Sequence, residues 1–236
     1  PLLDAIEGHS YNYNVLVHDI DGDAITLTVP TKPDWMSINT QSSLFFDGIN
    51  DSVSMGNLTP PELQVGENDF TIKVIFKANQ NSLQSGYAGT LVANRYISYG
   101  NGFDFFVGNM GMLQASIYDS NSETLFYATS DAGEGTEVSD GQWHIAHAVF
   151  DRDGNGTIYL DGIPGPSVAL AQQGNINNSR PFNVGALTGY TENQRLFNGN
   201  IKHVSLWDFA FNESDVQESM NENIIGNEPG LLGAWN

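Results

Sequence analysis

The stretch Phe70-Thr71-Ile72-Lys73-Val74-Ile75-Phe76-Lys77 indicates the fold class of this chain. From Phe70 to Phe76 an apolar residue occupies every second position, and successive side chains of a β-strand point to opposite faces. One face of such a strand would be continuously apolar, and the other would be mixed. The stretch therefore predicts a half-buried β-strand.

Similar short segments follow along the rest of the chain, separated by clusters of Gly, Asn and Asp that favour turns. Many short strands at this spacing are typical of a β-sandwich or β-barrel. The expected strands are Gly89 to Asn94, Phe103 to Val107, Leu113 to Tyr118, Trp143 to Phe150, Thr157 to Leu160, Phe182 to Val184 and Ile201 to Trp207.

The composition agrees with this interpretation. With 236 residues and 40% hydrophobic content, the chain can bury one large core or two small ones. Residues that favour helices are scarce, and only one short, peripheral helix is expected. The side chain of Asn212 can cap its first turn, which carries Glu213 and Asp215, and the helix should stop near Gly226.

Net charge, the absence of Cys and the short apolar runs each exclude a class of function or of site. The formal net charge of −20 would repel a nucleic acid, and the eight Lys and Arg residues are scattered. The chain has no Cys, so it forms no disulfide and no thiolate metal site. No apolar run approaches the roughly 20 residues that span a bilayer, so membrane insertion is not expected. An acidic, Asn-rich surface fits a secreted or cell-surface bacterial protein, and we expect a fragment of a longer exported chain.

The first forty residues differ from the rest. The segments Glu7-Gly8-His9-Ser10-Tyr11-Asn12-Tyr13-Asn14-Val15, Asp19-Ile20-Asp21-Gly22-Asp23 and Pro33-Asp34-Trp35-Met36-Ser37-Ile38 resemble, in this order, the opening half of bacterial cadherin-like or Ig-like repeats. The remaining strands of such a repeat do not follow. We therefore expect a partial repeat over residues 1–41, either a trimmed neighbour or, as we favour, half of a host domain split by the domain over residues 42–236.

From Leu44 onward, an ordered set of motifs resembles the laminin-G-like family of concanavalin A-like domains. The resemblance covers nearly all of the remaining chain. It implies an all-β jelly-roll sandwich of two facing antiparallel sheets, and binding more often than catalysis. The motifs are Leu44-Phe45-Phe46-Asp47-Gly48, Phe70-Thr71-Ile72, Gly89-Thr90-Leu91-Val92, Asp140-Gly141-Gln142-Trp143-His144, Ile158-Tyr159-Leu160-Asp161-Gly162, Asn183-Val184-Gly185, Phe197-Asn198-Gly199-Asn200-Ile201, Val204-Ser205-Leu206-Trp207-Asp208 and Gly230-Leu231-Leu232-Gly233-Ala234-Trp235.

The end of the chain, from Gly199 through Trp207 into a short helix, also resembles the pentraxin branch of this superfold. That resemblance implies ligand binding by the loop from Leu187 to Arg195, together with the turn from Tyr99 to Asn101. The loop supplies one carboxylate only, so a polar ligand fits it better than a paired calcium centre. The expected ligand-binding residues are Tyr99, Asn101, Tyr190, Glu192, Asn193, Gln194 and Arg195.

Calcium is the most plausible ion, because hard cations prefer several oxygen ligands and this chain concentrates Asp and Asn in turns. One candidate cluster is Asp19, Asp21 and Asp23. The other is Asp151, Asp153 and Asn155, which match half of an EF-hand loop. Gly162 occupies the twelfth position of that loop, so a simple hairpin turn is favoured there over a metal loop. Asp47, Asn50 and Asp51 form a weaker cluster, best interpreted as turn residues.

Catalysis is the less favoured class. Glu213-Ser214-Asp215-Val216-Gln217-Glu218 has the E-x-D-x-x-E spacing of laminarinase-type glucanases, but it follows a helix cap and lacks strand alternation, so it is expected to be a solvated helix. His144 and His147 would lie on opposite faces of one strand, with no nucleophile motif beside them. No histidine has a zinc-site spacing.

Three function classes remain. We favour a non-catalytic, glycan-binding module of a secreted or cell-surface adhesin, stabilised by calcium and joined to neighbouring domains of the same long chain. A surface protein is the alternative ligand. A spacer without ligand and a polysaccharide-cleaving glycosidase are the other two classes. Trp143, Trp207 and Trp235 fall on family motifs, so we expect them to be buried, whereas Tyr99 and Tyr190 could stack on a sugar.

Overall fold

A computed structural model describes residues 43–55, 59–79, 89–95, 100–108, 111–119, 123–127, 137–170, 174–187, 195–221, 224 and 226–235. The chain divides into two units, Pro1–Thr40 and Gln41–Asn236, and only the second contains described residues. The segment that resembles a cadherin-like repeat, with Asp19, Asp21 and Asp23, therefore lies outside the described residues.

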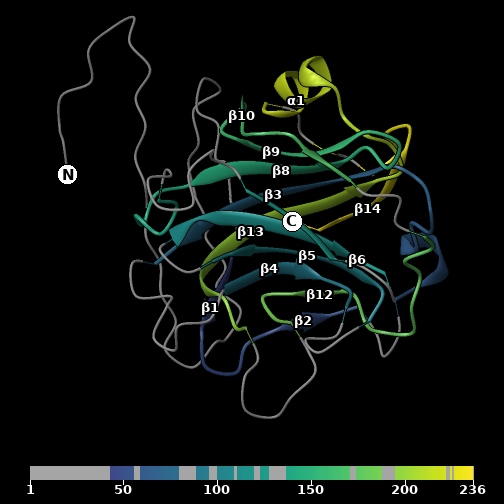
Figure 1. The fold of residues 1–236 in the computed structure, drawn as a ribbon. Coiled ribbons are helices and arrows are strands. Elements are labelled where there is room, and N and C mark those ends of the chain that lie inside the picture. Colours follow the sequence, from purple (N-terminus) through teal and green to yellow (C-terminus); the bar gives the residue numbers. More distant parts are fainter. Residues whose placement is uncertain are drawn as a thin grey trace, which may run out of the picture. The chain divides into compact units, whose positions relative to one another are not determined.

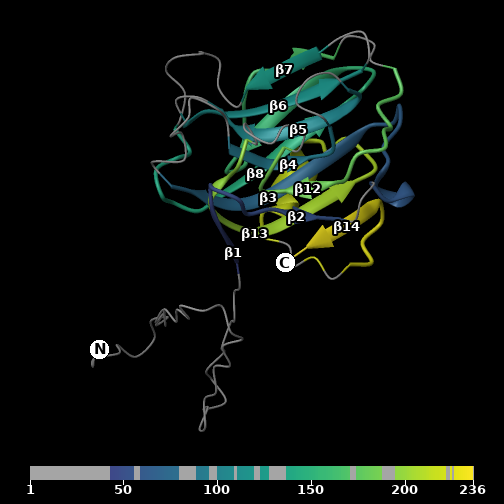
Figure 2. The same cartoon turned by 90° about the horizontal axis from the view of Figure 1, so that it is seen from below.

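The second unit contains two antiparallel sheets (Figures 1 and 2). The larger follows the order β1 (Leu44–Asp47), β13 (Asn198–Trp207), β3 (Phe70–Ala78), β8 (His144–Phe150), β9 (Asn155–Leu160) and β10 (Ile163–Pro164), with β11 (Val168–Ala169) paired to β9 and β14 (Leu231–Trp235) to β13. The smaller follows β2 (Val53–Ser54), β12 (Asn183–Val184), β4 (Gly89–Ala93), β5 (Gly102–Val107), β6 (Leu113–Tyr118) and β7 (Glu123–Tyr127). The predicted jelly-roll sandwich is confirmed. The sequence pattern missed β7 and the two-residue strands β2, β10 and β11, and it indicated β1 and β14 only as parts of family motifs.

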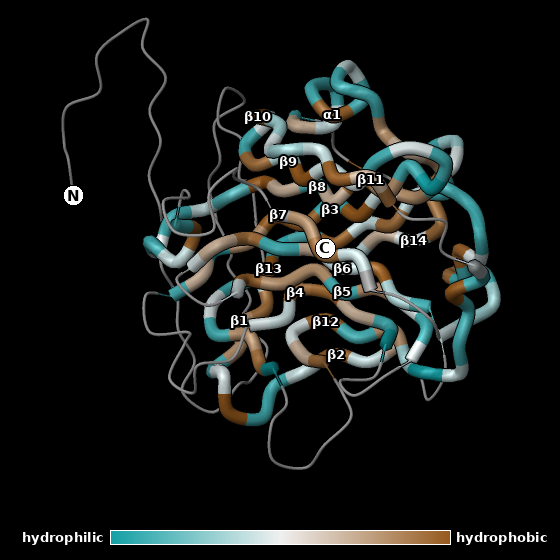
Figure 3. Tube along the Cα trace, viewed as in Figure 1, coloured by the Kyte–Doolittle hydropathy of each residue, from teal (hydrophilic) through white to brown (hydrophobic). Residues whose placement is uncertain are grey.

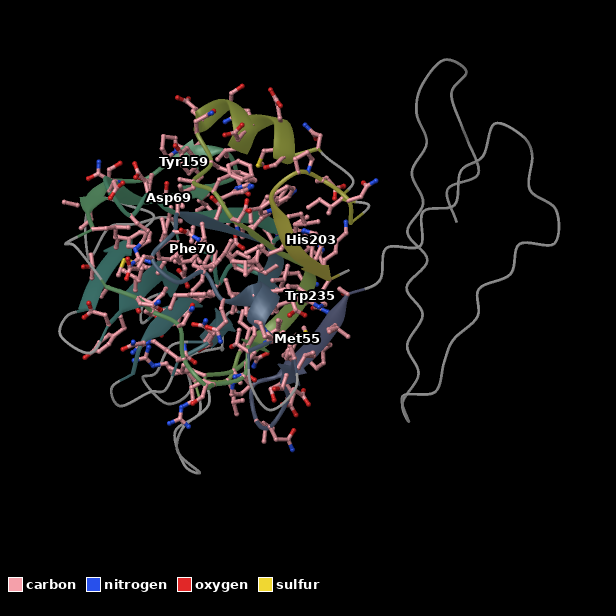
Figure 4. All side chains as sticks on the ribbon, turned by 90° about the vertical axis from the view of Figure 1, so that its right-hand side faces the viewer. Met55, Asp69, Phe70, Tyr159, His203 and Trp235 are labelled. Carbon is pink, nitrogen blue, oxygen red and sulfur yellow. The ribbon has the colours of Figure 1, made fainter. Side chains whose placement is uncertain are left out.

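The core lies between the two sheets and follows the alternation predicted for β3. The apolar residues of β3 from Phe70 to Phe76 that share one face are fully buried there. The ring of Phe70 stacks on Phe150 of β8, with ring centroids 4.1 Å apart, and lies 5.1 Å from Phe103 of β5 in the opposite sheet. Figure 4 shows Phe70 in the interior, and Figure 3 shows hydrophobic residues along the central strands. Each buried Phe contributes about 2 to 3 kcal/mol of hydrophobic free energy.

The helix α1 (Glu213–Ser219) covers the outer face of the larger sheet, beside β8 and β9 (Figure 1). Its predicted cap is confirmed. The side chain of Asn212 accepts hydrogen bonds from the backbone N–H groups of Ser214 and Asp215 at 2.8 and 3.1 Å, and the Asp215 carboxylate accepts the Asn212 N–H at 2.8 Å. The helix ends at Ser219, well before Gly226.

The helix is less solvated than the sequence predicts. Val216 is fully buried and packs with Trp207 of β13 and Val149 of β8 in a second, smaller apolar cluster. Tyr159 of β9 packs against the same cluster, and Figure 4 shows it close to the helix. Burial of this side is needed because a seven-residue helix is not stable by itself in water.

Two basic residues are buried between α1 and the sheet. Lys73 of β3, which is 1% exposed, donates from its ammonium to the backbone oxygen of Ser219 at the last turn of α1. His147 of β8 lies beside it, and its Nε2 is 2.8 Å from the Ser219 hydroxyl. Burial, with the positive charge of Lys73 and the nearby His203, lowers the pKa of His147 to about 3. The helix has no basic residue in its own last turn, so Lys73 supplies the positive charge that its C-terminal dipole favours.

His144 connects the two ends of the segment from Asp140 to Gly162, which contains the β8–β9 hairpin. Its Nδ1 is 2.8 Å from the Asp161 carboxylate, and its Nε2 is 3.3 Å from that of Asp140. Asp161 has a φ of 51°, and its carboxylate also accepts the Ile145 N–H at 2.9 Å. His144 and His147 lie on opposite faces of β8, as predicted. The prediction for Trp143 is wrong: it is 45% exposed, with the Lys77 ammonium 5.5 Å from its ring centroid.

The other two tryptophans are more enclosed. Trp207 is 4% exposed, as predicted, and Trp235 is half-buried and stacks on Phe182 with ring centroids 5.2 Å apart.

Gly199, in the motif Phe197-Asn198-Gly199, has a φ of 148°, and a Cβ there would lie 2.1 Å from the Lys77 oxygen. The close pairing of β13 with β3 therefore requires glycine at this position.

Candidate functional site

The outer face of the smaller sheet carries a buried polar cluster. On β5, Phe103, Phe105 and Val107 point into the core, so Asp104 and Phe106 point outward. The register places Ser116 of β6 opposite Asp104, and Thr90 of β4 opposite Phe106. All four outward residues are buried. This face therefore differs from an ordinary solvated sheet surface.

Two arginines meet at the Asp104 carboxylate. The Arg95 Nε is 3.1 Å from Asp104 Oδ2, and an Arg195 guanidinium nitrogen is 3.6 Å from the same oxygen. The Ser116 hydroxyl donates to the other oxygen, Oδ1. The side chain of Asp104 is completely buried, Arg95 is 5% exposed and Arg195 is 25% exposed. We call these three charged residues the Asp104 cluster.

Local structure positions each arginine of the Asp104 cluster. Arg95 follows β4, where the Asn94 side chain accepts the Phe103 N–H at 2.9 Å and fixes the base of the β4–β5 connection. The Arg95 guanidinium carbon lies 5.2 Å from the ring centroid of Tyr118. Arg195 lies along the start of β4, since its backbone oxygen accepts the Thr90 N–H at 3.0 Å. Its guanidinium carbon is 5.2 Å from the ring centroid of Phe106.

Of the predicted ligand-binding residues, the structure describes Arg195 and Asn101. Arg195 belongs to the Asp104 cluster. The Asn101 amide donates to the Asn175 oxygen at 2.9 Å, and its backbone oxygen accepts a hydrogen bond from the Asn178 side chain. Asn101 thus holds the 174–180 segment against the start of β5. The other five, Tyr99, Tyr190, Glu192, Asn193 and Gln194, lie outside the described residues and stay predictions.

The stretch from Asp151 to Asn155 forms the β8–β9 hairpin turn, as favoured over a metal loop. The Gly154 N–H donates to the Asp151 oxygen at 3.1 Å, and Asn155 already belongs to β9. Arg152, within this turn, is buried and donates to the oxygens of Gly66 and Gly174 at 3.1 and 2.8 Å. A guanidinium at this position opposes binding of a divalent cation.

Asp153 borders a hollow of about 340 Å³, which is lined by Glu67, Asn68, Asp69, Arg152, Asp153, Asp208 and Phe209. Burial lowers the pKa of Arg152, although nearby carboxylates, Asp69 first, oppose that shift. Among the described residues, no three His, Cys, Asp or Glu side chains are arranged to hold a metal ion. Calcium at this turn, as at Asp19, Asp21 and Asp23, stays a prediction.

The acids of the glucanase-like spacing do not converge on the Asp104 cluster. Glu213 and Asp215 lie in the first turn of α1, and Glu218 is exposed on the same helix. Asp47 and Asp51 are turn residues, as predicted, because Asp47 accepts the Ile49 N–H and Asp51 accepts the Asp47 N–H.

Sequence reasoning missed Arg95 and Asp104. The signal for Asp104 was present, because it interrupts the apolar run of β5 at an outward position. A charged residue between two buried Phe residues needs a partner of opposite charge. The identity of that partner depends on strand pairing.

Similar solved structures share the fold. A heptameric SAP-like pentraxin from Limulus polyphemus is 15% identical, with a TM-score of 0.57 over 80% of this chain and 86% of that one. The binding domain of Paraclostridial Mosquitocidal Protein 1 is 19% identical, with a TM-score of 0.56 over 76% and 43%. Domains LG4-5 of the mouse laminin alpha1 chain are 12% identical, with a TM-score of 0.52 over 79% and 48%.

At these identities, the likeness to the solved structures shows the fold of this chain. No curated protein matches the sequence. None of the described helices has the length and apolar character needed to cross a bilayer. The Laminin_G_3 family model, described as the concanavalin A-like lectin/glucanases superfamily, matches residues 37–217, more than half of the chain. The chain therefore belongs to this laminin-G-like family of the concanavalin A-like superfamily.

Proposed function

We propose that this domain is a non-catalytic, glycan-binding module, and that its ligand contacts the outer face of the smaller sheet at Arg195. The observation that carries the proposal is that Arg195 and Arg95, which follows β4, both lie close to the Asp104 carboxylate. These two chain segments flank the predicted ligand loops, which continue into Tyr99 on one side and Gln194 on the other. Binding sites of this kind combine aromatic rings with a few fixed polar groups, and this face offers both.

The surroundings of Asp104 favour binding over hydrolysis. Glycosidases use two carboxyl groups, about 5 to 9.5 Å apart, and one of them must give up a proton to the leaving group. The Asp104 cluster contains one carboxyl group, whose oxygens face two guanidinium groups and accept the Ser116 hydroxyl. The cluster therefore lacks the pair of carboxyl groups that hydrolysis requires. Incubation with polysaccharides should release no reducing sugar.

The same proposal places the domain outside the cell, in a bacterial adhesin with a partial cadherin-like repeat before it. The support is the net charge of −20 and the order of motifs before residue 41. Calcium would bind at Asp19, Asp21 and Asp23 in that repeat, where three closely spaced carboxylates suit a hard cation. A single shallow site would bind a sugar weakly, at micromolar to millimolar Kd, so adhesion would require many copies.

A glycan array on the purified chain tests this function. We expect saturable binding to at least one glycan class. Tyr190→Ala combined with Gln194→Ala should remove that binding while the melting temperature stays nearly constant, because both residues belong to a predicted ligand loop outside the core strands. Asp153→Asn, an exposed change in the β8–β9 turn, is the control and should bind as the wild type does. A blank array would instead support the spacer function.

A further inference from the structure

Arg195 carries a positive charge that the rest of the Asp104 cluster does not neutralise. Arg95 lies 0.5 Å closer than Arg195 to the shared oxygen, at 3.1 against 3.6 Å, and it is almost completely buried. One buried arginine and one buried carboxylate form a balanced ion pair. The second arginine therefore leaves the cluster with a charge of +1, in a chain whose net charge is −20.

The hydrogen-bond donors of Arg195 are also available. A guanidinium offers five N–H donors in a fixed plane. Within the described part of the chain, those of Arg195 make no hydrogen bond, and the guanidinium contacts only Asp104, at 3.6 Å, and the Phe106 ring. Most buried donors in folded proteins have hydrogen-bond partners. The Arg195 guanidinium is three-quarters buried and has none among the described residues, so its N–H groups are suited to donate to an oxyanion.

A second, independent observation points to a ligand here. The Thr90 hydroxyl is completely buried on the same outward face, opposite Phe106, and none of the residues that the structure describes forms a hydrogen bond with it. The Thr90 N–H holds the backbone oxygen of Arg195. Thr90 and Arg195 therefore present an unused hydroxyl and an unused guanidinium from adjacent chain segments.

We propose that Arg195 binds the oxyanion of an acidic sugar, a uronic acid carboxylate or a sulfate ester, with Phe106 as the floor of the site and Arg95 neutralising Asp104. This inference rests on the proposed glycan-binding function and names its ligand class. A planar guanidinium donates two parallel hydrogen bonds to the two oxygens of a carboxylate. Neutral sugars lack such a charged pair of acceptors. Asp104 holds the Arg195 guanidinium in place. Repulsion between the Asp104 carboxylate and the oxyanion of the sugar limits the affinity for the sugar.

The test measures binding of trigalacturonate, its methyl ester and a galactose 6-sulfate oligosaccharide by isothermal titration calorimetry. Arg195→Met keeps an unbranched side chain over Phe106 but removes the charge, and Arg195→Lys keeps the charge but removes the planar fork. Arg180→Gln is the matched control, because Arg180 is exposed and lies outside the Asp104 cluster. Melting temperatures show whether each variant is folded.

For the wild type we expect acidic ligands to bind at least tenfold more tightly than the methyl ester, with weaker binding at high salt. Arg195→Met should lose this preference, Arg195→Lys should keep part of it, and Arg180→Gln should keep all of it. The two acidic ligands distinguish a carboxylate from a sulfate, and a preference for either supports the proposal.

Equal binding of trigalacturonate by the wild type and Arg195→Met would overturn this inference and leave the glycan-binding function intact. The same holds if the methyl ester binds as tightly as the acid. If no oligosaccharide binds and the glycan array is also blank, both proposals fail. If Arg195→Met does not fold, Arg195→Lys provides the test. If this variant keeps the full preference for the acid over the methyl ester, with the same salt dependence, the planar guanidinium has no role in binding.

Discussion

The outer faces of the two sheets both bury positive charge, but in different ways. Under α1, Lys73 donates to the oxygen of Ser219, and His147 remains neutral in an apolar, helix-covered space. On the smaller sheet, Arg95 and Arg195 share one carboxylate, and the Arg195 guanidinium donates no hydrogen bond to any described residue. The first arrangement completes a structural contact, whereas the second leaves capacity for a ligand. The number of donors that remain unused, more than burial, separates a structural cluster from a candidate site.

The largest expected effect concerns His147. Its pKa in the folded chain, about 3, lies below the ordinary value of 6.5, so the unfolded chain binds the proton more tightly. The stability due to neutral His147 is complete above pH 6.5 and is lost as the pH falls from 6.5 to 3. Each pKa unit corresponds to about 1.4 kcal/mol, so the total loss approaches about 5 kcal/mol.

Denaturant titrations at several pH values measure this loss. His147→Gln cannot titrate, so the difference in slope between it and the wild type isolates His147 from the many carboxylates. Lys73→Met should raise the pKa of His147 in the folded chain, because it removes a nearby positive charge. Identical pH slopes for the wild type and His147→Gln would show that His147 is protonated with ordinary affinity in the folded chain.

The next effect concerns Asp104. Asp104→Asn keeps the size of the side chain but removes the buried carboxylate that faces Arg95 and Arg195, and breaking a buried ion pair from one side costs about 3 to 5 kcal/mol. Urea unfolding should show this loss. The matched control, Asp153→Asn, removes an exposed carboxylate and should change the free energy of unfolding by less than about 0.5 kcal/mol. Similar stabilities for the two variants would mean that the Asp104 cluster is solvated.

The smallest effect concerns the cap of α1. Asn212→Ala removes the acceptor for two backbone N–H groups and should cost about 1 kcal/mol. Asn212→Asp preserves the acceptor and should leave the free energy of unfolding almost unchanged. Faster amide exchange in α1 of Asn212→Ala, with unchanged exchange in β4 and β5, would show that the two outer faces are energetically separate. Faster exchange in both places would contradict that separation.

Much of the fold could be predicted because strands and caps are local. The alternation in β3 requires only that neighbouring side chains point to opposite faces, and the Asn212 cap depends on residues within three positions. Predictions that needed distant partners were less reliable. Trp143 belongs to a buried family motif, yet it lies at the start of β8 and contacts Lys77 in place of the core. The helix stops at Ser219, whose backbone oxygen accepts a hydrogen bond from the ammonium of Lys73, far away in sequence.

The sequence by itself determined that the chain is all-β and acidic, because alternation, turn residues and net charge are properties of the chain. Its ordered motifs carried the resemblance to the laminin-G-like family. It also indicated the segment that ends at Arg195. Only the tertiary structure decided which residues share an environment. The pairing of β4 with β5 and β6 brings Arg95, Asp104 and Ser116 together with Arg195, although 100 positions separate the two arginines. Ion pairs form through space, so strand register decides which charges meet.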